Sequence, residues 1–406
     1  MSRRVIGVFT GNRAEYGLQL PILQAIDAHP DLDYRLIVSG AHLDDDFGRT
    51  LTEIETDGFT VHAEVKIDMD EDSLFGTARA IGSGVLSISE TLARLQPELL
   101  VVYADRFEGF AAVIAGTQTN TPTAHVEGGD LTEGGALDDS VRHAMTKLAH
   151  LHFTTNQQAT NRILAMGEEP WRVHMAGFPA IDLIAQGQFA SANEVVTRFG
   201  LSLDQPIVVF TQHSVTTQFD TAAGQVAPAL TALEQLADEG VQVILTYPNN
   251  DAGGRRIIVS LNRFVEGGRP GVQLHRSVGR HYYHGLLALA RNPHVSLACA
   301  GNSSSGIKEA PAFGCPTVNI GSRQDGRLRA GNVIDADYNS DQIHGAINRA
   351  LFDRAFRMRC RSLDNPYGTG EAGRKISDVL AKVSLGDRLL RKKMTLQGEE
   401  RDGWFR

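Results

Sequence analysis

The chain has 406 residues, more than one ordinary hydrophobic core accommodates, and this length indicates two domains. Apolar residues make up 42% and charged residues 21%, a composition typical of a globular protein and not of a disordered chain. The formal net charge of −9 argues against a nucleic-acid-binding surface. The locally basic stretch Arg391–Lys393 is interpreted as a solvated tail.

The three cysteines are Cys299, Cys315 and Cys360, and no two of them form a C-x-x-C pair. This spacing disfavours a disulfide framework and a thiolate metal site, and it suits a reducing cytoplasm. The apolar run Val5–Phe9 is shorter than the core of a signal peptide. No run approaches the roughly 20 apolar residues of a membrane span. We therefore expect a soluble, cytoplasmic protein without a membrane segment.

In the first half of the chain, short apolar runs alternate with helical patterns. Periodic stretches such as Leu18–Ala28 and Gly84–Leu95 predict helices. Continuous apolar runs that alternate with helices indicate a parallel sheet covered on both faces. The predicted strands of this half are Val5–Thr10, Tyr34–Ser39, Leu99–Tyr103, Thr123–Val126 and His152–Thr154.

The second half repeats this pattern after an interruption between about Gly177 and Ala190. Its predicted strands are Ile207–Thr211, Val241–Thr246, Val295–Ala300 and Thr317–Ile320. The sequence thus predicts two Rossmann-like, doubly wound α/β domains. Ligands of such sheets bind beyond the carboxyl ends of the strands, so polar residues that follow strands are the candidate functional residues.

Two polar segments follow predicted strands of the first domain. Gly11–Gly17 contains Arg13, which can hold an anion at a helix start, although a simple strand-to-helix turn explains the segment as well. Asp105 follows Leu99–Tyr103, and on its own it is more simply a helix-capping residue.

The segment from His125 to His143 carries the stronger signal. Glu127 stands where a strand stops, beside two glycines, and Asp138 and Asp139 open the next helical pattern. Helix capping explains the aspartate pair but not the glutamate. Several carboxylates and histidines in one place are what proton abstraction and return require.

In the second domain, His213 follows the strand Ile207–Thr211, and Asn249 lies in a polar loop after the next strand. The segment Gly301–Ala310 follows a strand and opens a helix. Its backbone N–H groups, its helix dipole and its serine hydroxyls predict a diphosphate-binding loop, against the alternative of a serine-capped helix without a ligand.

Further residues complete this predicted nucleotide site. Glu309 lies further along the same predicted helix, where a carboxylate can accept two ribose hydroxyls. Arg323 follows the strand Thr317–Ile320 and supplies a cation beside the phosphates.

With these residues in place, the chain resembles the hydrolysing UDP-N-acetylglucosamine 2-epimerases of sialic-acid and related nonulosonic-acid synthesis. The resemblance covers about residues 4–380 and rests on motifs in the family's order: GNRAEYG, SGAHLDDDFG, ADRFEG, HVEGG, LDDSVRHAMTKLAHLHF, TQH, GNSSSGIKEAPAFGCPTVNIGSRQDGR and NPYGTG. It implies the glycosyltransferase-B fold, with an active site in the interdomain cleft. The implied divisions are an N-terminal domain at 1–180, a UDP-binding domain at 181–368, and a C-terminal helix that returns to the first domain, with a tail, at 369–406.

The resemblance also implies a reaction without metal or nicotinamide cofactor. UDP leaves as the C2 proton is removed, and water then adds to the 2-acetamidoglucal. The implied acid and base groups are Asp105, Glu127, Asp138 and His213, with no assignment of which carboxylate acts as acid or base. The implied substrate- and UDP-binding residues are Arg13, His42, Asp139, Arg142, Asn249, Ser303, Ser304, Glu309 and Arg323.

Some positions depart from the family pattern. Ala104 replaces the usual glycine, the loop at Gly134–Gly135 has an additional glycine, and residues after about 385 have no counterpart. Leu18, where non-hydrolysing relatives carry lysine, and the segment TQHSVTT favour the hydrolysing branch.

The sequence leaves alternatives open. The sugar can instead be a UDP-linked 2,4-diacetamido-2,4,6-trideoxyhexose. A retaining glycosyltransferase or a nucleotide-sugar-binding regulator shares the UDP site but does not need the carboxylates. The expected assembly is a homodimer or homotetramer.

Overall fold

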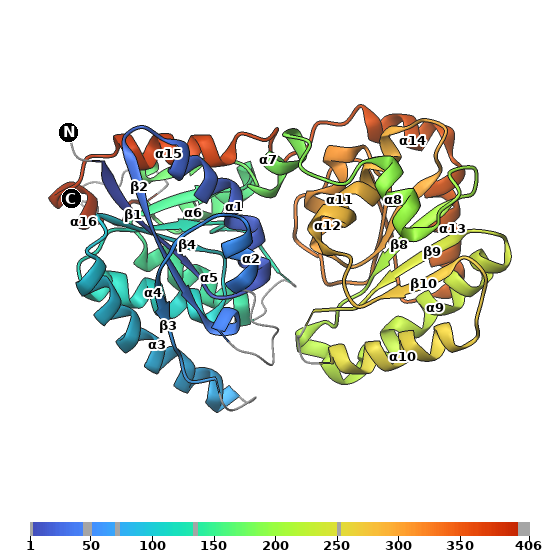
Figure 1. Ribbon diagram of the computed structural model, residues 1–406, viewed down its shortest axis with the longest axis horizontal. Helices are drawn as coiled ribbons and strands as arrows, with labels where there is room; N and C mark the ends of the chain where they lie inside the picture. Colours follow the sequence, from blue (N-terminus) through green and yellow to red (C-terminus); the bar gives the residue numbers. More distant parts are fainter. Residues whose placement is uncertain (1–2, 44–50, 70–73, 133–136, 250–252, 397–406) are drawn as a thin grey trace. The chain divides into compact units, whose positions relative to one another are not determined.

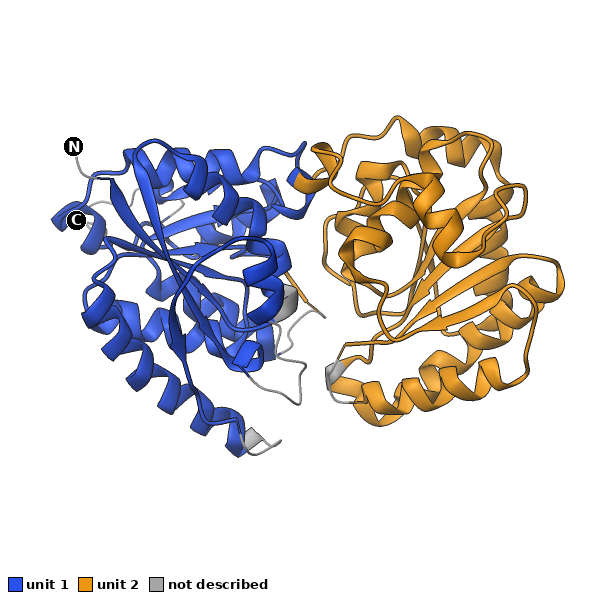
Figure 2. Ribbon diagram, in the orientation of Figure 1, with its two compact units in different colours: residues 1–130, 137–182, 367–406 blue, residues 131–136, 183–366 orange. Residues whose placement is uncertain are grey.

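The computed structural model describes residues 3–43, 51–69, 74–132, 137–249 and 253–396. It divides into two compact units (Figure 2). Unit 1 comprises residues 1–130, 137–182 and 367–406, and unit 2 comprises residues 131–136 and 183–366. The chain therefore leaves unit 1 after Asp182, builds most of unit 2 and returns to unit 1 at Tyr367.

Unit 1 is built on a seven-stranded parallel sheet in the order β3-β2-β1-β4-β5-β6-β7. Its strands are β1 (Arg4–Thr10), β2 (Leu32–Ser39), β3 (Val61–Val65), β4 (Leu99–Tyr103), β5 (Thr123–Val126), β6 (Leu151–Thr154) and β7 (Val173–Met175). The helices of this unit (Figure 1) are α1 (Arg13–Ala28), α2 (Leu51–Thr56), α3 (Leu74–Leu95), α4 (Phe107–Gln118), α5 (Leu137–Leu148), α6 (Gln157–Ala165), α15 (Ala372–Lys382) and α16 (Asp387–Leu390), with 3-10 turns η1 (Gly40–Leu43) and η3 (Pro170–Arg172).

Unit 2 contains a six-stranded parallel sheet in the order β10-β9-β8-β11-β12-β13. Its strands are β8 (Ile207–Thr211), β9 (Gln242–Thr246), β10 (Val272–His275), β11 (Leu297–Gly301), β12 (Thr317–Ile320) and β13 (Val333–Ala336). Helix α7 (Ala180–Ala185) spans the passage from unit 1. The other helices are α8 (Ala192–Phe199), α9 (Ala222–Asp238), α10 (Gly254–Glu266), α11 (Gly279–Ala288), α12 (Ser304–Lys308), α13 (Ser340–Phe352) and α14 (Arg354–Arg361), with 3-10 turns η4 (Thr216–Thr221), η5 (Leu289–Arg291) and η6 (Ala310–Phe313). Among the described residues, no helix has both the length and the apolar character needed to cross a membrane.

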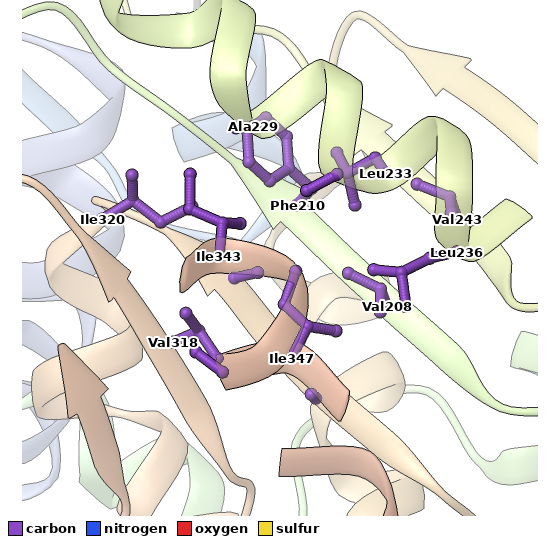
Figure 3. Packing of buried hydrophobic residues seen from close by; sticks show 14 of the residues in the cluster. Val208, Phe210, Ala229, Leu233, Leu236, Val243, Val318, Ile320, Ile343 and Ile347 are labelled. Atoms are coloured by element: carbon purple, nitrogen blue, oxygen red, sulfur yellow. The ribbon is translucent and has the colours of Figure 1, made fainter. Parts of the chain in front are cut away.

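The central strand β8 shows why the second sheet is covered on both faces. Successive side chains of a strand point to opposite faces. Val208 and Phe210 belong to the core formed with α9 and α13 (Figure 3), whereas Ile207 and Val209 belong to a second core on the other face. All four side chains are fully buried, and burial of each stabilises the fold by roughly 1.5–3 kcal/mol. The continuous apolar run is therefore the pattern of a strand buried on both sides.

The four edge strands β3, β7, β10 and β13 are the ones that the sequence pattern did not single out. Each contains partly buried or exposed positions, and all four residues of β10 are only partly buried. Edge strands are covered incompletely, so polar residues interrupt the apolar run that identifies a central strand.

Helix α15 brings the end of the chain back to unit 1. Both carboxylate oxygens of Asp182 accept hydrogen bonds from its first backbone N–H groups, at 2.9 Å from Ala372 and 2.7 Å from Gly373. A Cβ atom at Gly373 would lie 2.4 Å from the carbonyl oxygen of Pro21 on α1, so only glycine allows the two helices to approach this closely.

The residues after α15 are also bound to unit 1. The buried guanidinium of Arg172 donates hydrogen bonds to the carbonyl oxygens of Arg388 and Leu389, each at 2.7 Å. Lys392 has a side chain that is 16% exposed, and its ammonium contacts the carboxylate of Glu168 at 2.8 Å. The interpretation of Arg391–Lys393 as a solvated tail is therefore wrong for Lys392, because a buried carboxylate from elsewhere in unit 1 needs its charge.

Glu168 makes the stability of unit 1 sensitive to acid. Its carboxylate is fully buried and contacts His152 at 3.0 Å and Lys147 at 2.6 Å. Burial alone raises the pKa of Glu168, but hydrogen bonds from His152 and the two lysines outweigh burial and lower that pKa from 4.5 to about 2. Between pH 4.5 and about pH 2, the unfolded chain therefore binds a proton at Glu168, whereas the folded chain does not.

We expect this carboxylate to contribute on the order of 3 kcal/mol to the free energy of unfolding above pH 4.5, and the contribution should disappear as the pH falls towards 2. Burial also lowers the pKa of His152 to about 4, so the unfolded chain binds a proton there at a higher pH than the folded chain does. The free energy of unfolding should therefore also fall as the pH drops from 6.5 to 4. Glu168→Gln should lower stability at pH 7 and flatten its decline below pH 4.5, as measured by urea unfolding. Glu64→Gln, at an exposed position of β3, is the matched control, and an unchanged pH profile for Glu168→Gln would contradict the assignment.

Candidate functional site

The loop after β11 lies against the end of β8 in unit 2. Gly301 has a φ angle of +118°, and a Cβ atom there would lie 2.0 Å from the carbonyl oxygen of Thr211. Only glycine fits this position. The close approach brings the residues that follow β11 next to those that follow β8.

Asn302 connects the residues that follow β8, β11 and β12. Its side-chain oxygen accepts a hydrogen bond from the backbone N–H of His213 at 2.6 Å, and its amide group donates to the carbonyl oxygen of His213 at 2.9 Å. The carbonyl oxygen of Asn302 accepts from Arg323 at 3.2 Å and from Gln324 at 2.8 Å. The structure therefore brings the predicted residues His213 and Arg323 together with the serine loop. Asn302 was part of the motif without a predicted role.

The surroundings of His213 define its protonation state. Its Nδ1 accepts a hydrogen bond from the backbone N–H of Asn249 at 3.0 Å, so the proton of the neutral ring is on Nε2. Burial, followed by the positive charge of Arg323, lowers the pKa of His213 to about 3. The imidazole is therefore neutral at physiological pH and offers an N–H donor. Asn249 holds it through its backbone, and contact of the Asn249 side chain with a substrate remains a prediction.

The helix that follows the serine loop is shorter than expected. α12 ends at Lys308, so Glu309 caps the helix and does not lie within it, contrary to the sequence interpretation. Pro311 disfavours a helical conformation in the residue before it and cannot donate a backbone hydrogen bond, and the chain continues as the 3-10 turn η6. A five-residue helix has a weak dipole, so anion binding at this loop depends mainly on N–H groups and hydroxyls.

The serine hydroxyls stand at the first turn of α12. Ser303 is the N-cap residue, and its Oγ accepts from the backbone N–H of Ser305 at 3.4 Å. Ser303 and Ser304 are partly exposed, whereas Ser305 is buried. The first two hydroxyls are thus accessible to a ligand that approaches the loop.

In unit 1, the candidate acids follow β4 and β5. His125 is buried in β5, its Nε2 contacts the carbonyl oxygen of Ala104 at 2.6 Å, and its Nδ1 contacts the hydroxyl of Thr146 at 3.2 Å. Burial lowers the pKa of His125 to about 3. Because both ring nitrogens are bound within the protein, His125 supports the end of β4 and is not placed to exchange a proton with a substrate.

Two non-glycine residues at these strand ends have left-handed backbone conformations. Ala104 has a φ angle of +53° and Glu127 a φ angle of +66°. Such a conformation is unfavourable by roughly 1–2 kcal/mol for a residue with a side chain. The strain at Ala104 explains physically why glycine suits this position. Glu127 is also buried, and backbone strain of this kind is concentrated at functional sites.

Asp105 is held by a buried arginine. Arg142, on α5, donates hydrogen bonds to the carboxylate of Asp105, to Asp139 at 2.8 Å and to the carbonyl oxygen of Asp130 at 2.7 Å. Burial lowers the pKa of Arg142, but Asp105 and the other surrounding carboxylates outweigh burial and raise it. Arg142 therefore remains charged and orients Asp105. A direct contact of Arg142 or Asp139 with a substrate remains a prediction.

The remaining predicted residues of unit 1 differ in their surroundings. Asp138 is exposed in the first turn of α5, next to Asp139. His42 is buried in η1, with its Nε2 at 3.1 Å from the hydroxyl of Thr10, and burial lowers its pKa to about 4. Arg13 begins α1, but its side chain, like the loop at Gly134–Gly135, lies outside the described part of the chain.

Comparisons with known proteins identify the family of this chain. The family model described as UDP-N-acetylglucosamine 2-epimerase matches residues 24–381. A UDP-N,N'-diacetylbacillosamine 2-epimerase (hydrolyzing) from Legionella pneumophila is 32% identical over 97% of this chain and 99% of its own. A UDP-N-acetylglucosamine 2-epimerase from Neisseria meningitidis is 32% identical over 84% of this chain and 86% of its own.

The chain belongs to the UDP-N-acetylglucosamine 2-epimerase family.

The fold is shared as well. The crystal structure of UDP-GlcNAc 2-epimerase from Neisseria meningitidis bound to UDP-GlcNAc superimposes with a TM-score of 0.79, at 17% identity, over 94% of this chain and 100% of that one. The prediction of two α/β domains of the glycosyltransferase-B type, each with a parallel sheet, is thereby confirmed.

Two buried carboxyl groups of this family member were not predicted as site residues, although both lie in quoted motifs. Glu15 accepts hydrogen bonds from the backbone N–H of Gly11 at 3.3 Å and from the amide of Gln19 at 2.8 Å. Burial, with the charge of Glu108 as the next contribution, raises the pKa of Glu15 well above its usual value, and burial raises that of Glu108. A Cβ atom at Gly11 would lie 2.7 Å from the Cβ of Glu108, so the two strand ends meet here. The signal in the sequence was an acid within each polar segment after β1 and β4.

Proposed function

We propose that this protein is a hydrolysing UDP-N-acetylglucosamine 2-epimerase, which converts UDP-N-acetylglucosamine and water to N-acetylmannosamine and UDP. The observation that carries the proposal is the group of acids at the ends of β4 and β5 and at the start of α5, in a member of this family. A retaining glycosyltransferase or a UDP-sugar-binding regulator has no need of Asp105, Glu127 and Asp138 together. These acids therefore favour the epimerase over both alternatives.

In the first step, a carboxylate among Asp105, Glu127 and Asp138 removes the proton from C2. The C1–O bond breaks, its electron pair leaves with UDP, and a C1–C2 double bond forms in the 2-acetamidoglucal. Asp105 is suited to an oriented role because Arg142 holds its carboxylate. His213 supplies a neutral N–H donor to a developing negative charge.

In the second step, water adds across the double bond. Its hydroxyl group bonds to C1, and a proton returns to C2 on the face opposite to the one it left. Two acids with different surroundings suit this exchange, since one must give a proton while another accepts one. Glu127 is buried and Asp138 is exposed, which provides such a difference.

The nucleotide is assigned to unit 2. Ser303 and Ser304 would donate hydrogen bonds to the diphosphate, and Arg323, beside the same loop, would supply positive charge. Glu309 would accept hydrogen bonds from the ribose hydroxyls. Arg13, His42, Asp139, Arg142 and Asn249 complete the proposed substrate-binding set, which awaits substitution experiments.

Isotope labelling tests the reaction directly. Turnover in deuterated, ¹⁸O-labelled water should place deuterium at C2 and heavy oxygen at C1 of the released sugar, and no label in UDP. Mass spectrometry and NMR of the products measure this, and added NAD should have no effect. Heavy oxygen in the phosphate would indicate attack at phosphorus, and retention of the original C2 hydrogen would exclude the elimination step.

A second candidate substrate is a UDP-linked 2,4-diacetamido-2,4,6-trideoxyhexose. The Legionella pneumophila relative, which aligns with nearly its whole length, is named for a sugar of this kind. The chemistry at C1 and C2 is the same for both sugars, so the two candidates differ only in recognition of C4 and C6. Comparison of kcat/KM for UDP release from the two sugars decides between them.

The setting of the reaction is proposed on the same basis. We infer a homodimer or homotetramer in the cytoplasm that serves sialic-acid or related nonulosonic-acid synthesis. Analytical ultracentrifugation measures the assembly, and cell fractionation with an antibody measures the compartment.

A further inference from the structure

The side chains of His284, which is buried, and Glu309, which is partly buried, are joined by a hydrogen bond in unit 2. The Nε2 atom of His284 lies 2.5 Å from Oε2 of Glu309, and the two side chains are 1% and 13% exposed. His284 is on α11, whereas Glu309 caps α12 immediately after the serine loop. A carboxylate is an acceptor, so the imidazole donates this hydrogen bond. No motif in the sequence connected the two residues.

The imidazole ring is fixed by its surroundings. It packs at 5.5 Å, centroid to centroid, against the ring of Phe313 in η6 and at 6.5 Å against Tyr283. Rings packed in a dense interior have few rotamers available. The ring therefore holds Oε2 of Glu309 and restricts rotation of the carboxylate.

We propose that His284 is a positioning residue, which holds the carboxylate of Glu309 in the orientation that accepts hydrogen bonds from the ribose hydroxyls of the nucleotide. This inference rests on the proposed function, in which Glu309 is the ribose acceptor. His284 itself does not touch the nucleotide. A carboxylate that is already oriented loses less conformational freedom when the ligand binds, and this gain appears as affinity.

The alternative is that His284 only fills space between α11 and η6. In that case its replacement would disturb the serine loop and η6 together, and it would affect every ligand of the site. The positioning role predicts an effect confined to ligands that have ribose hydroxyls. The two roles are therefore separable by the choice of nucleotide.

The experiment is calorimetric titration of the full chain with UDP and with 2′,3′-dideoxy-UDP. His284→Leu removes the donor, and His284→Gln retains an amide nitrogen at the same position along the side chain as Nε2. We expect His284→Leu to lower the affinity for UDP about tenfold, which is the scale of one hydrogen bond to a charged group. The affinity for the dideoxy nucleotide should stay unchanged. His284→Gln should recover most of the loss.

Glu309→Ala supplies the reference. It should reduce the preference for UDP over the dideoxy nucleotide, and the addition of His284→Leu should then cause no further change. Thermal unfolding of each unliganded variant confirms that it is folded before titration. Equal weakening of both nucleotides by His284→Leu, or no weakening of either, would overturn the positioning role.

These results separate the two proposals. Wild-type protein that binds neither nucleotide contradicts the proposed function. In a second outcome, the wild-type protein prefers UDP, Ser303→Ala weakens the binding of both nucleotides, and His284→Leu has no selective effect. That outcome supports the proposed function and rejects the role of His284. A wild-type protein that binds both nucleotides equally rejects the ribose contact and His284 with it.

Discussion

Asp105→Asn, Glu127→Gln and Asp138→Asn should each lower kcat by roughly 10²-fold or more, the usual scale for loss of a positioned proton-transfer group. The affinity for UDP should change little, because the residues assigned to the diphosphate lie in unit 2 and these acids lie in unit 1. Initial rates of UDP release and calorimetric titration with UDP measure the two quantities. A lower kcat with unchanged affinity for UDP would identify the three acids as groups that act in the reaction and not in nucleotide binding.

Glu90→Gln, at an exposed position of α3, is the matched control and should leave both quantities unchanged. Asp105 requires a second check, because its loss leaves the buried guanidinium of Arg142 with one carboxylate fewer. Thermal unfolding of Asp105→Asn separates a fold defect from a catalytic defect. Near-normal turnover in all three acid variants would place the chemistry elsewhere.

Ser303→Ala combined with Ser304→Ala should lower the affinity for UDP, and it leaves Asp105, Glu127 and Asp138 unchanged. Two hydrogen bonds to a charged diphosphate contribute roughly 1.5–3 kcal/mol each, before any non-additivity. An affinity loss of at least tenfold is therefore expected in calorimetric titration. Ser303 is also the N-cap of α12, so its replacement should lower fold stability by about 1 kcal/mol.

Ser260→Ala, on α10, is the control for a serine hydroxyl that bonds only within its own helix. Ser304→Ala alone tests binding without removal of the cap. Unchanged UDP affinity in the double variant would place the nucleotide away from this loop, whatever the effect on stability.

The order of elements followed from the sequence because central strands and helices have local signals. A strand buried on both faces, such as β8, is a continuous apolar run, and the polar residues after it are the ones that line a parallel sheet's carboxyl edge. These two rules placed His213, Asp105 and Glu127 beyond strand ends. The motifs in their order then indicated the family, which the comparisons confirm.

The contacts between these residues could not be read from the sequence, because they join positions far apart along the chain. Asn302 binds the backbone of His213, Arg142 orients Asp105, and His284 fixes Glu309. Each contact depends on which strands are neighbours and on how each side chain is directed, and neither is encoded in local spacing. The backbone strain at Ala104 and Glu127 likewise appears only when the chain is folded.

The sequence by itself therefore determined the fold class, the family and the kinds of chemical group at the strand ends, because hydrophobic periodicity and motif order are local properties. Only the tertiary structure decided the protonation and orientation of those groups, because burial and non-local hydrogen bonds set both. It made His125 a support for the end of β4, made His213 a neutral donor, ended α12 before Glu309 and placed Lys392 against a buried carboxylate.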